Sequence, residues 1–108
     1  MRIVQANIAT VTIDGQPQDR DADLDHQKQF EVETDSGIRY IVTCEGPPEG
    51  LPSDWEVTRR DDGRVLGHVG RIDTGWPGSY SYRFKKAGAF FAGGTQMDLW
   101  NAVQSLME

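Results

Sequence analysis

Apolar and polar residues alternate along several short stretches of this chain, as they do in strands with one buried face. The clearest stretch places Tyr80, Tyr82 and Phe84 on one face, with serine and basic residues between them. Near Ala9 the apolar positions change parity, which indicates a β-bulge. The pattern predicts six strands, at residues 3–13, 30–34, 38–44, from Trp55 to the turn at 62–63, 65–72 and 80–85.

Turn residues separate these stretches. Asp35-Ser36-Gly37 and Asp62-Gly63 are hairpin signals, because glycine supplies the left-handed backbone angle that a tight turn needs. Residues 73–78 form a further turn of the same kind. Two longer loops are expected, a polar one at 14–27 and a Pro/Gly-rich one at 46–53.

A helix is expected at residues 95–107. Thr95 followed by Asp98 is similar to a capping box, which satisfies the unpaired amides of a first helical turn. Apolar residues then recur at helical spacing and form one stripe: Leu99, Trp100, Val103, Leu106 and Met107. A helix this short has to pack on the sheet to be stable.

Together these elements predict an α+β fold, in which an antiparallel sheet of about six short strands carries one C-terminal helix. We expect one domain over residues 1–108, because each half alone is near the size at which a core fails. Its parts are a strand, acidic loop and hairpin at 1–45, the Pro/Gly loop at 46–53, a three-strand meander at 54–86 and the helix at 95–107.

The meander followed by a helix resembles, in order and spacing, the small sheet-plus-helix domains of the integrase-arm type, which lay a three-stranded sheet against DNA. The resemblance covers about half the chain and depends on the residues Trp55, Asp62, Gly63, Arg64, Arg71, Arg83 and Lys85 and on the helix at 96–107. It implies a similar architecture only, since one fold serves many functions.

Charge is divided unevenly along the chain, whose net charge is −6. Residues 1–58 carry four basic and twelve acidic side chains, whereas residues 59–86 carry seven basic and three acidic ones. Several cations on one sheet face would suit phosphate groups. Alternatively, they pair with Glu31, Glu33 and the aspartates of the first half, and the net negative charge favours this reading. The candidate nucleic-acid-binding residues are Arg59, Arg60, Arg64, Arg71, Arg83, Lys85 and Lys86.

Acidic residues at alternate positions of the first loop form a candidate binding segment: Asp19, Asp21, Asp23 and Asp25. Their spacing is similar to that of a calcium loop, but Leu24 replaces its glycine and Phe30 its final glutamate. A solvated loop, or one that docks on a basic partner, is favoured. Trp76, at an expected loop tip, is either a contact anchor or a lid on the core. Phe90 and Phe91 extend the candidate partner-binding region.

Motifs of catalysis and metal binding are weak in this sequence. His26 and His68 have no cysteine or histidine at metal-ligand spacing, so we expect no metal and no cofactor. A Cys44–His68 nucleophilic pair is conceivable, although a single cysteine on an apolar strand is usually a small buried hydrophobe. No nucleophile elbow, phosphate-binding loop or dinucleotide fingerprint occurs. We therefore expect no enzyme activity.

The expected function is non-catalytic binding of another protein, as an adaptor, inhibitor or phage-type accessory regulator, including self-association. The alternative is a nucleic-acid-binding domain that uses the basic meander at 59–86, and a lesser one is a small-molecule pocket between helix and sheet. The single cysteine and the lack of an apolar leader or spanning segment favour a cytoplasmic location without membrane contact.

Overall fold

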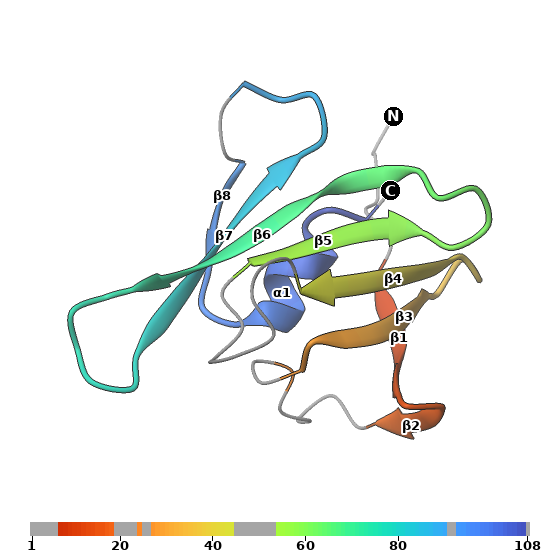
Figure 1. Cartoon of the computed structure of the whole chain (residues 1–108), viewed down its shortest axis with the longest axis horizontal. Helices are drawn as coiled ribbons and strands as arrows, with labels where there is room; N and C mark the ends of the chain where they lie inside the picture. The colour runs from red at the N-terminus through yellow and green to blue at the C-terminus, as the bar shows by residue number, and fades with distance from the viewer. Residues whose placement is uncertain (1–6, 19–23, 25–26, 45–53, 91–92, 108) are drawn as a thin grey trace.

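A computed structural model describes residues 7–18, 24, 27–44, 54–90 and 93–107. These residues form one antiparallel sheet with a short helix packed on one face (Figure 1). The elements are β1 (Ile8–Ile13), β2 (Gln16–Gln18), β3 (Gln29–Thr34), β4 (Arg39–Cys44), β5 (Asp54–Arg59), β6 (Val65–Asp73), β7 (Tyr80–Lys86), β8 (Gly94–Gln96) and α1 (Leu99–Gln104).

The eight strands follow the order β2-β1-β3-β4-β5-β6-β7-β8 across the sheet, and every neighbouring pair is antiparallel. The predicted class, an antiparallel sheet with one small C-terminal helix, is confirmed. The predicted number of about six strands is too low, because β2 and β8 each add a three-residue strand at one edge of the sheet.

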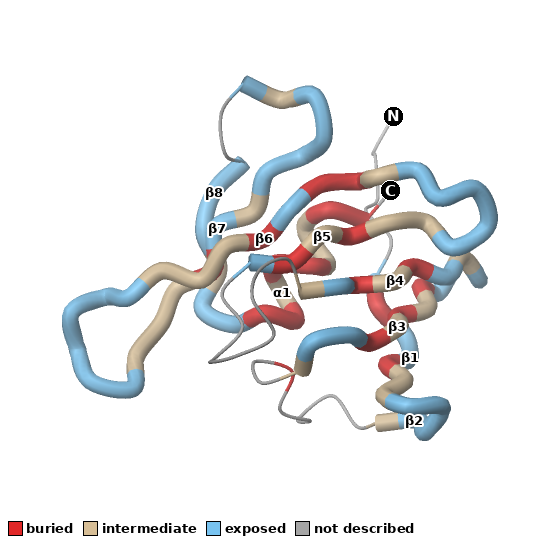
Figure 2. Tube along the Cα trace, viewed as in Figure 1, coloured by how far each residue is buried: buried red, intermediate tan, exposed pale blue. Residues whose placement is uncertain are grey.

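The core lies between α1 and the face of the sheet that the helix covers. Alternate residues of the central strands are buried there, while the hairpin tips are exposed (Figure 2). Trp55 is fully buried, and its indole Nε1 donates a hydrogen bond to the Gln27 carbonyl at 3.1 Å. The strand side chains of the core include Val11, Phe30, Val32, Tyr40, Val42, Val57, Val69 and Tyr82, and α1 adds Leu99, Trp100, Ala102 and Val103.

The helix also contacts the first half of the chain. The side-chain oxygen Oε1 of Gln104 accepts a hydrogen bond from the backbone N–H of Ile8 at 3.1 Å. This bond links the last turn of α1 to the start of β1. The helix, which packs on β6, β7 and β8, is thereby also joined to the other half of the sheet.

The first extra strand arises from a tight turn inside the expected polar loop. Asp14 and Gly15 have φ values of 51° and 79°, the left-handed angles of a two-residue hairpin turn. Ile13 and Gln16 close this turn, and Pro17 lies opposite Thr12. The expectation of a loop over residues 14–27 was therefore wrong for its first part.

The second extra strand replaces the expected start of the helix. Thr95 pairs with Arg83 in the sheet, so it does not cap the helix. Asp98 is the N-cap instead: its backbone is extended, with φ −144°, and its Oδ1 accepts the Asn101 N–H at 2.7 Å. The helix thus covers Leu99–Gln104, shorter than the predicted 95–107, although Leu106 and Met107 are buried as expected.

Two irregular positions shape the sheet. The pairing of β1 with β3 shifts between Ile8 and Thr10, which confirms the predicted bulge near Ala9. The pairing of β5 with β6 shifts between Val57 and Thr58, and Gly67, the partner of Val57, is buried near the Leu106 side chain. Glycine is required here because a β-carbon would contact the Lys85 carbonyl of the neighbouring strand.

Candidate protein-binding surface

The sheet face opposite α1, which we call the open face, carries charged residues in cross-strand pairs. Glu33 lies 3.7 Å from Arg39, and Glu56 lies 3.4 Å from the His68 imidazole. Glu31 lies 3.6 Å from Arg60, which joins the acidic half of the sequence to the basic half. The basic segment at 59–86 is therefore paired in part with the acidic segment at 1–58 within the sheet. This is the pairing that the net negative charge led us to favour.

The seven basic residues considered for nucleic acid are distributed over both faces of the sheet. Arg83 and Lys85 are exposed on the open face, and no ion pair joins them to any residue that the structure describes. Arg71 lies in register with Tyr82, on the face that the helix covers, and its guanidinium stacks 4.7 Å from the centre of the Tyr80 ring. Phosphates along one face would thus meet only part of the set.

Arg59 belongs to a local cluster at the β5–β6 turn. Its Nε donates to Oδ1 of Asp62 at 3.1 Å, and the backbone N–H of Arg64 donates to the same oxygen at 3.0 Å. The hydrogen bond from Arg59, followed by that from the Arg64 amide, lowers the pKa of Asp62 to about 2. The pair stabilises the turn, and Arg59 is committed to it.

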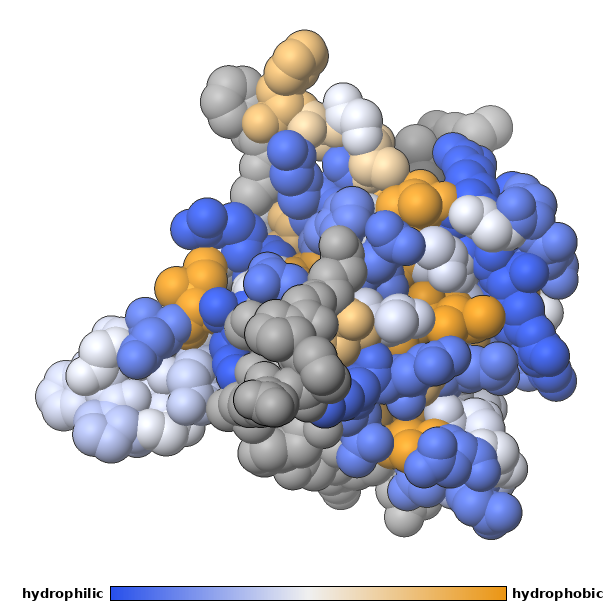
Figure 3. Space-filling view, in the orientation of Figure 1, coloured by the Kyte–Doolittle hydropathy of each residue, from blue (hydrophilic) through white to orange (hydrophobic). Residues whose placement is uncertain are grey.

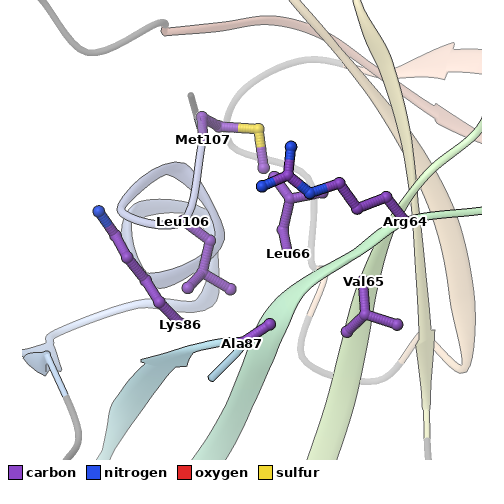
Figure 4. A pocket seen from close by; sticks show the side chains of 7 residues that line it. All are labelled: Arg64, Val65, Leu66, Lys86, Ala87, Leu106 and Met107. Carbon is purple, nitrogen blue, oxygen red and sulfur yellow. The ribbon is translucent and has the colours of Figure 1, made fainter. Parts of the chain in front are cut away.

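Two more of the basic residues line a hollow between the sheet and the end of the helix. It measures about 210 Å³, and Arg64 and Lys86 lie at its sides (Figure 4). Pockets for drug-sized ligands usually measure about 300–1,000 Å³. The hollow is therefore too small for a typical ligand site, although it is where a pocket between helix and sheet was expected. Its other lining residues are Val65, Leu66, Ala87, Leu106 and Met107.

Trp76 lies at the tip of the β6–β7 hairpin, which extends away from the rest of the sheet (Figure 1). The side chain is 76% exposed, so it does not cover the core. Hydrogen bonds order the tip: Oδ1 of Asp73 accepts the Gly75 N–H at 2.8 Å, and the Ser79 N–H donates to the Trp76 carbonyl at 3.0 Å. The Thr74 hydroxyl donates to the Ser79 carbonyl at 3.1 Å. The structure thus presents a large aromatic ring on an ordered loop.

Phe90 is 93% exposed, but it lies in the β7–β8 loop at the other end of β7. Trp76 and Phe90 are thus separated by the length of that strand (Figure 1). The structure does not bring them into one contact surface. Phe91 and the acidic residues Asp19, Asp21, Asp23 and Asp25 lie outside the described residues.

A nucleophilic pair of Cys44 and His68 is not formed. Cys44 follows Tyr40 and Val42 on the face that packs against the core, whereas His68 lies on the open face beside Glu56. Among the described residues, no cluster of three or more His, Cys, Asp or Glu side chains is placed to hold a metal ion. Within the same residues, no helix has the length and apolar character needed to cross a membrane.

Sequence reasoning also missed the exposed edge strand β8. Thr95 is exposed there, and Met97, just after the strand, is 81% exposed. The Gly93-Gly94 pair obscured the strand, because glycines before a cap resemble a flexible connection. In the space-filling view, hydrophobic residues form separate patches among hydrophilic ones (Figure 3). No family model, curated protein or solved structure matches this chain.

Proposed function

We propose that this chain is a non-catalytic protein-binding module and that Trp76 anchors its partner. The single observation that carries the proposal is a tryptophan with 76% of its surface exposed on a hydrogen-bonded hairpin tip. Tryptophan is usually well buried, and it is among the residues that contribute most to protein interfaces. An ordered tip loses little conformational entropy on binding, which favours affinity.

The neighbouring residues support a contact region around the tip. Arg71 and Tyr80 stack beside it on one side of the hairpin, and Asp73 holds the turn. Aromatic and arginine side chains are enriched at interfaces because they combine apolar area with directed hydrogen bonds. This arrangement fits an adaptor or inhibitor that has no catalytic activity. We propose that it acts in the cytoplasm, where Cys44, the single cysteine of the sequence, stays reduced.

Nucleic-acid binding is the second candidate, and Arg83 and Lys85 favour it. They lie two residues apart on the open face, and no described residue forms an ion pair with either. Two adjacent cations make few phosphate contacts, and the net charge of −6 opposes the approach of a polyanion. For this reason protein binding is preferred.

Affinity capture from a lysate of the source cells, with immobilised protein, tests the proposal. The wild type and a Phe90→Ala variant should retain the same partner, and Trp76→Ala should not. Phe90 is the matched control, because it is an aromatic residue outside the hairpin tip and is even more exposed than Trp76. Loss of a central tryptophan should weaken the purified complex by at least about 2 kcal/mol, or roughly thirtyfold.

Two further measurements separate the candidates. Light scattering after size-exclusion chromatography reports self-association, and a dimer that Trp76→Ala dissociates would make a second copy the partner. Anisotropy of mixed-sequence DNA and RNA, at low and physiological salt, tests the nucleic-acid alternative. Tight, salt-sensitive binding that is lost in Arg83→Ala with Lys85→Ala would replace our proposal, as would a partner that Trp76→Ala retains unchanged.

A further inference from the structure

The two edges of the sheet differ in how they meet a further strand. An exposed edge offers unpaired backbone groups, and proteins commonly protect such edges with proline or charge. At the β2 edge, Ile13 and Gln16 close a two-residue turn as a hydrogen-bonded pair, so the next pair, Thr12 and Pro17, directs its backbone groups outward. Pro17 has no N–H to donate. The β2 edge is therefore blocked at its outward position.

At the other edge, the pairing of β6 with β7 sets which groups point outward. The Ala87 N–H donates to the Leu66 carbonyl at 2.8 Å, so these two residues form a hydrogen-bonded pair. Such pairs alternate with non-hydrogen-bonded ones along an antiparallel ladder. The register of β6 and β7 is continuous, and Arg83 is therefore hydrogen-bonded to β6.

The residues on either side of Arg83 bond to β8. Tyr82 lies opposite Gln96, and Phe84 lies opposite Gly94. Thr95, between these two partners, consequently directs its own N–H and C=O away from the sheet. Its side chain is exposed, and β8 is the last strand of the sheet that the described residues form. The β8 edge thus presents one donor and one acceptor, with no proline and no charge on the strand.

A basic side chain lies directly behind this outward position. Arg83 is in register with Thr95, and both side chains are on the open face. A strand added to β8 would place a residue opposite Thr95, with its Cα about 10 Å from that of Arg83 by the usual pair spacings. The side chains of Arg83 and of a glutamate on the added strand are together long enough to span this distance, because the Thr95 side chain between them is short. Lys85, two residues along β7, adds a second positive charge.

From this geometry we propose that the β8 edge binds an extended acidic segment of a partner protein as a ninth, antiparallel strand. The segment pairs with the outward N–H and C=O of Thr95, and its carboxylates face Arg83 and Lys85. Strand addition supplies affinity through the backbone, while alternate side chains supply selectivity. Met97, exposed just beyond the strand, contributes apolar contact area. This site is distinct from the Trp76 tip and does not depend on it.

Fluorescence anisotropy with end-blocked peptides tests the proposal. A labelled peptide of alternating valine and glutamate should bind the wild type, and the same peptide with lysine for glutamate should not. Arg83→Gln should weaken binding about two- to fivefold, the value of an exposed ion pair. Thr95→Pro removes the outward N–H, as Pro17 does at the opposite edge, and should weaken binding about tenfold through the lost hydrogen bond. Thr95→Val keeps the N–H and should not change binding.

Arg83→Glu is a second variant, which leaves the backbone groups of β8 as they are. It should bind the lysine peptide more tightly than the glutamate peptide. Unfolding midpoints equal to that of the wild type show that each variant is folded. Absence of binding by the glutamate peptide, equal binding of both peptides, or full binding by a folded Thr95→Pro variant would overturn the proposal. So would a dimer that Thr95→Pro dissociates, or DNA that displaces the peptide and binds more tightly. Because Trp76→Ala leaves this edge intact, failure here is distinguishable from failure of the proposed function.

Discussion

Substitution of Gly67 by alanine tests the packing of the sheet against the end of the helix. An alanine β-carbon at this position would contact the Lys85 carbonyl, and it would lie 2.9 Å from Cδ2 of Leu106 and 3.0 Å from Cα of Lys86. Two of these three neighbours are backbone atoms of β7, which move only if the β6–β7 ladder opens. The clash therefore cannot be relieved by rotating a side chain.

The magnitude follows from two opposing effects. Overpacking a well-packed site costs about 1–3 kcal/mol, and the backbone contact places Gly67→Ala at the upper end. Replacing glycine by alanine in a strand returns about 0.5–1 kcal/mol, because the unfolded chain loses less entropy. We expect a net loss of about 2 kcal/mol in the free energy of unfolding, or roughly 8 °C in Tm for a domain of this size.

Gly70→Ala is the matched control in the same strand. Its β-carbon would meet only Oδ1 of Asp54, at 3.3 Å, and a side-chain oxygen can move. We expect this variant to be between unchanged and about 1 kcal/mol more stable than the wild type. Urea unfolding followed by the fluorescence of Trp55 and Trp100, both buried, measures both variants. A Gly67→Ala variant within about 0.5 kcal/mol of Gly70→Ala would refute the argument.

Two further predictions concern single carboxylates. The pKa of Asp62 is lowered from 3.8 to about 2, so its ionised form stabilises the folded state above pH 4, and this contribution is lost as the pH falls through about 2. The difference in urea midpoint between the wild type and Asp62→Asn should shrink over that range, whereas an Asp62 carboxyl that titrates near 3.8 by NMR would contradict it. Asp98→Ala should cost about 1 kcal/mol through loss of the N-cap, while Asp98→Asn keeps an acceptor and should cost much less. Equal losses for these two variants in thermal unfolding would show that Asp98 does not act as the cap.

The sequence was informative where side chains alternate over several residues. The period of two at Tyr80, Tyr82 and Phe84 and the glycine turns at Gly37 and Gly63 lead directly to β7 and to two hairpins. The turn at Asp14-Gly15 carries the same Asp-Gly signal as the turn at 62–63, so β2 was predictable in principle. Its exposed three-residue strand contains a proline and has no alternation of its own.

The start of the helix was harder to predict for a different reason. Thr95 and Asp98 both suit an N-cap, and the sequence does not show that Thr95 has a strand partner in Arg83. Because the choice depends on a tertiary contact, local propensity could not decide it. Predicting which charged residues share a face of the sheet had the same limit. Alternation placed Arg83 and Lys85 on one face, but only the register shows which basic residues share a face with carboxylates.

The position of α1 in the chain has a consequence for biosynthesis. The helix covers the apolar face of a sheet whose eight strands all precede it, and Gln104 bonds back to Ile8 across 96 positions. During translation, at about 5–20 residues per second, strands can pair with their neighbours as they leave the ribosome. The part of this face on β6 and β7 against which α1 packs, with Val69 and Tyr82, lacks the helix until α1 emerges. The nascent chain therefore passes through a state, on the order of seconds long, in which this part of its future core is open to other chains and to chaperones.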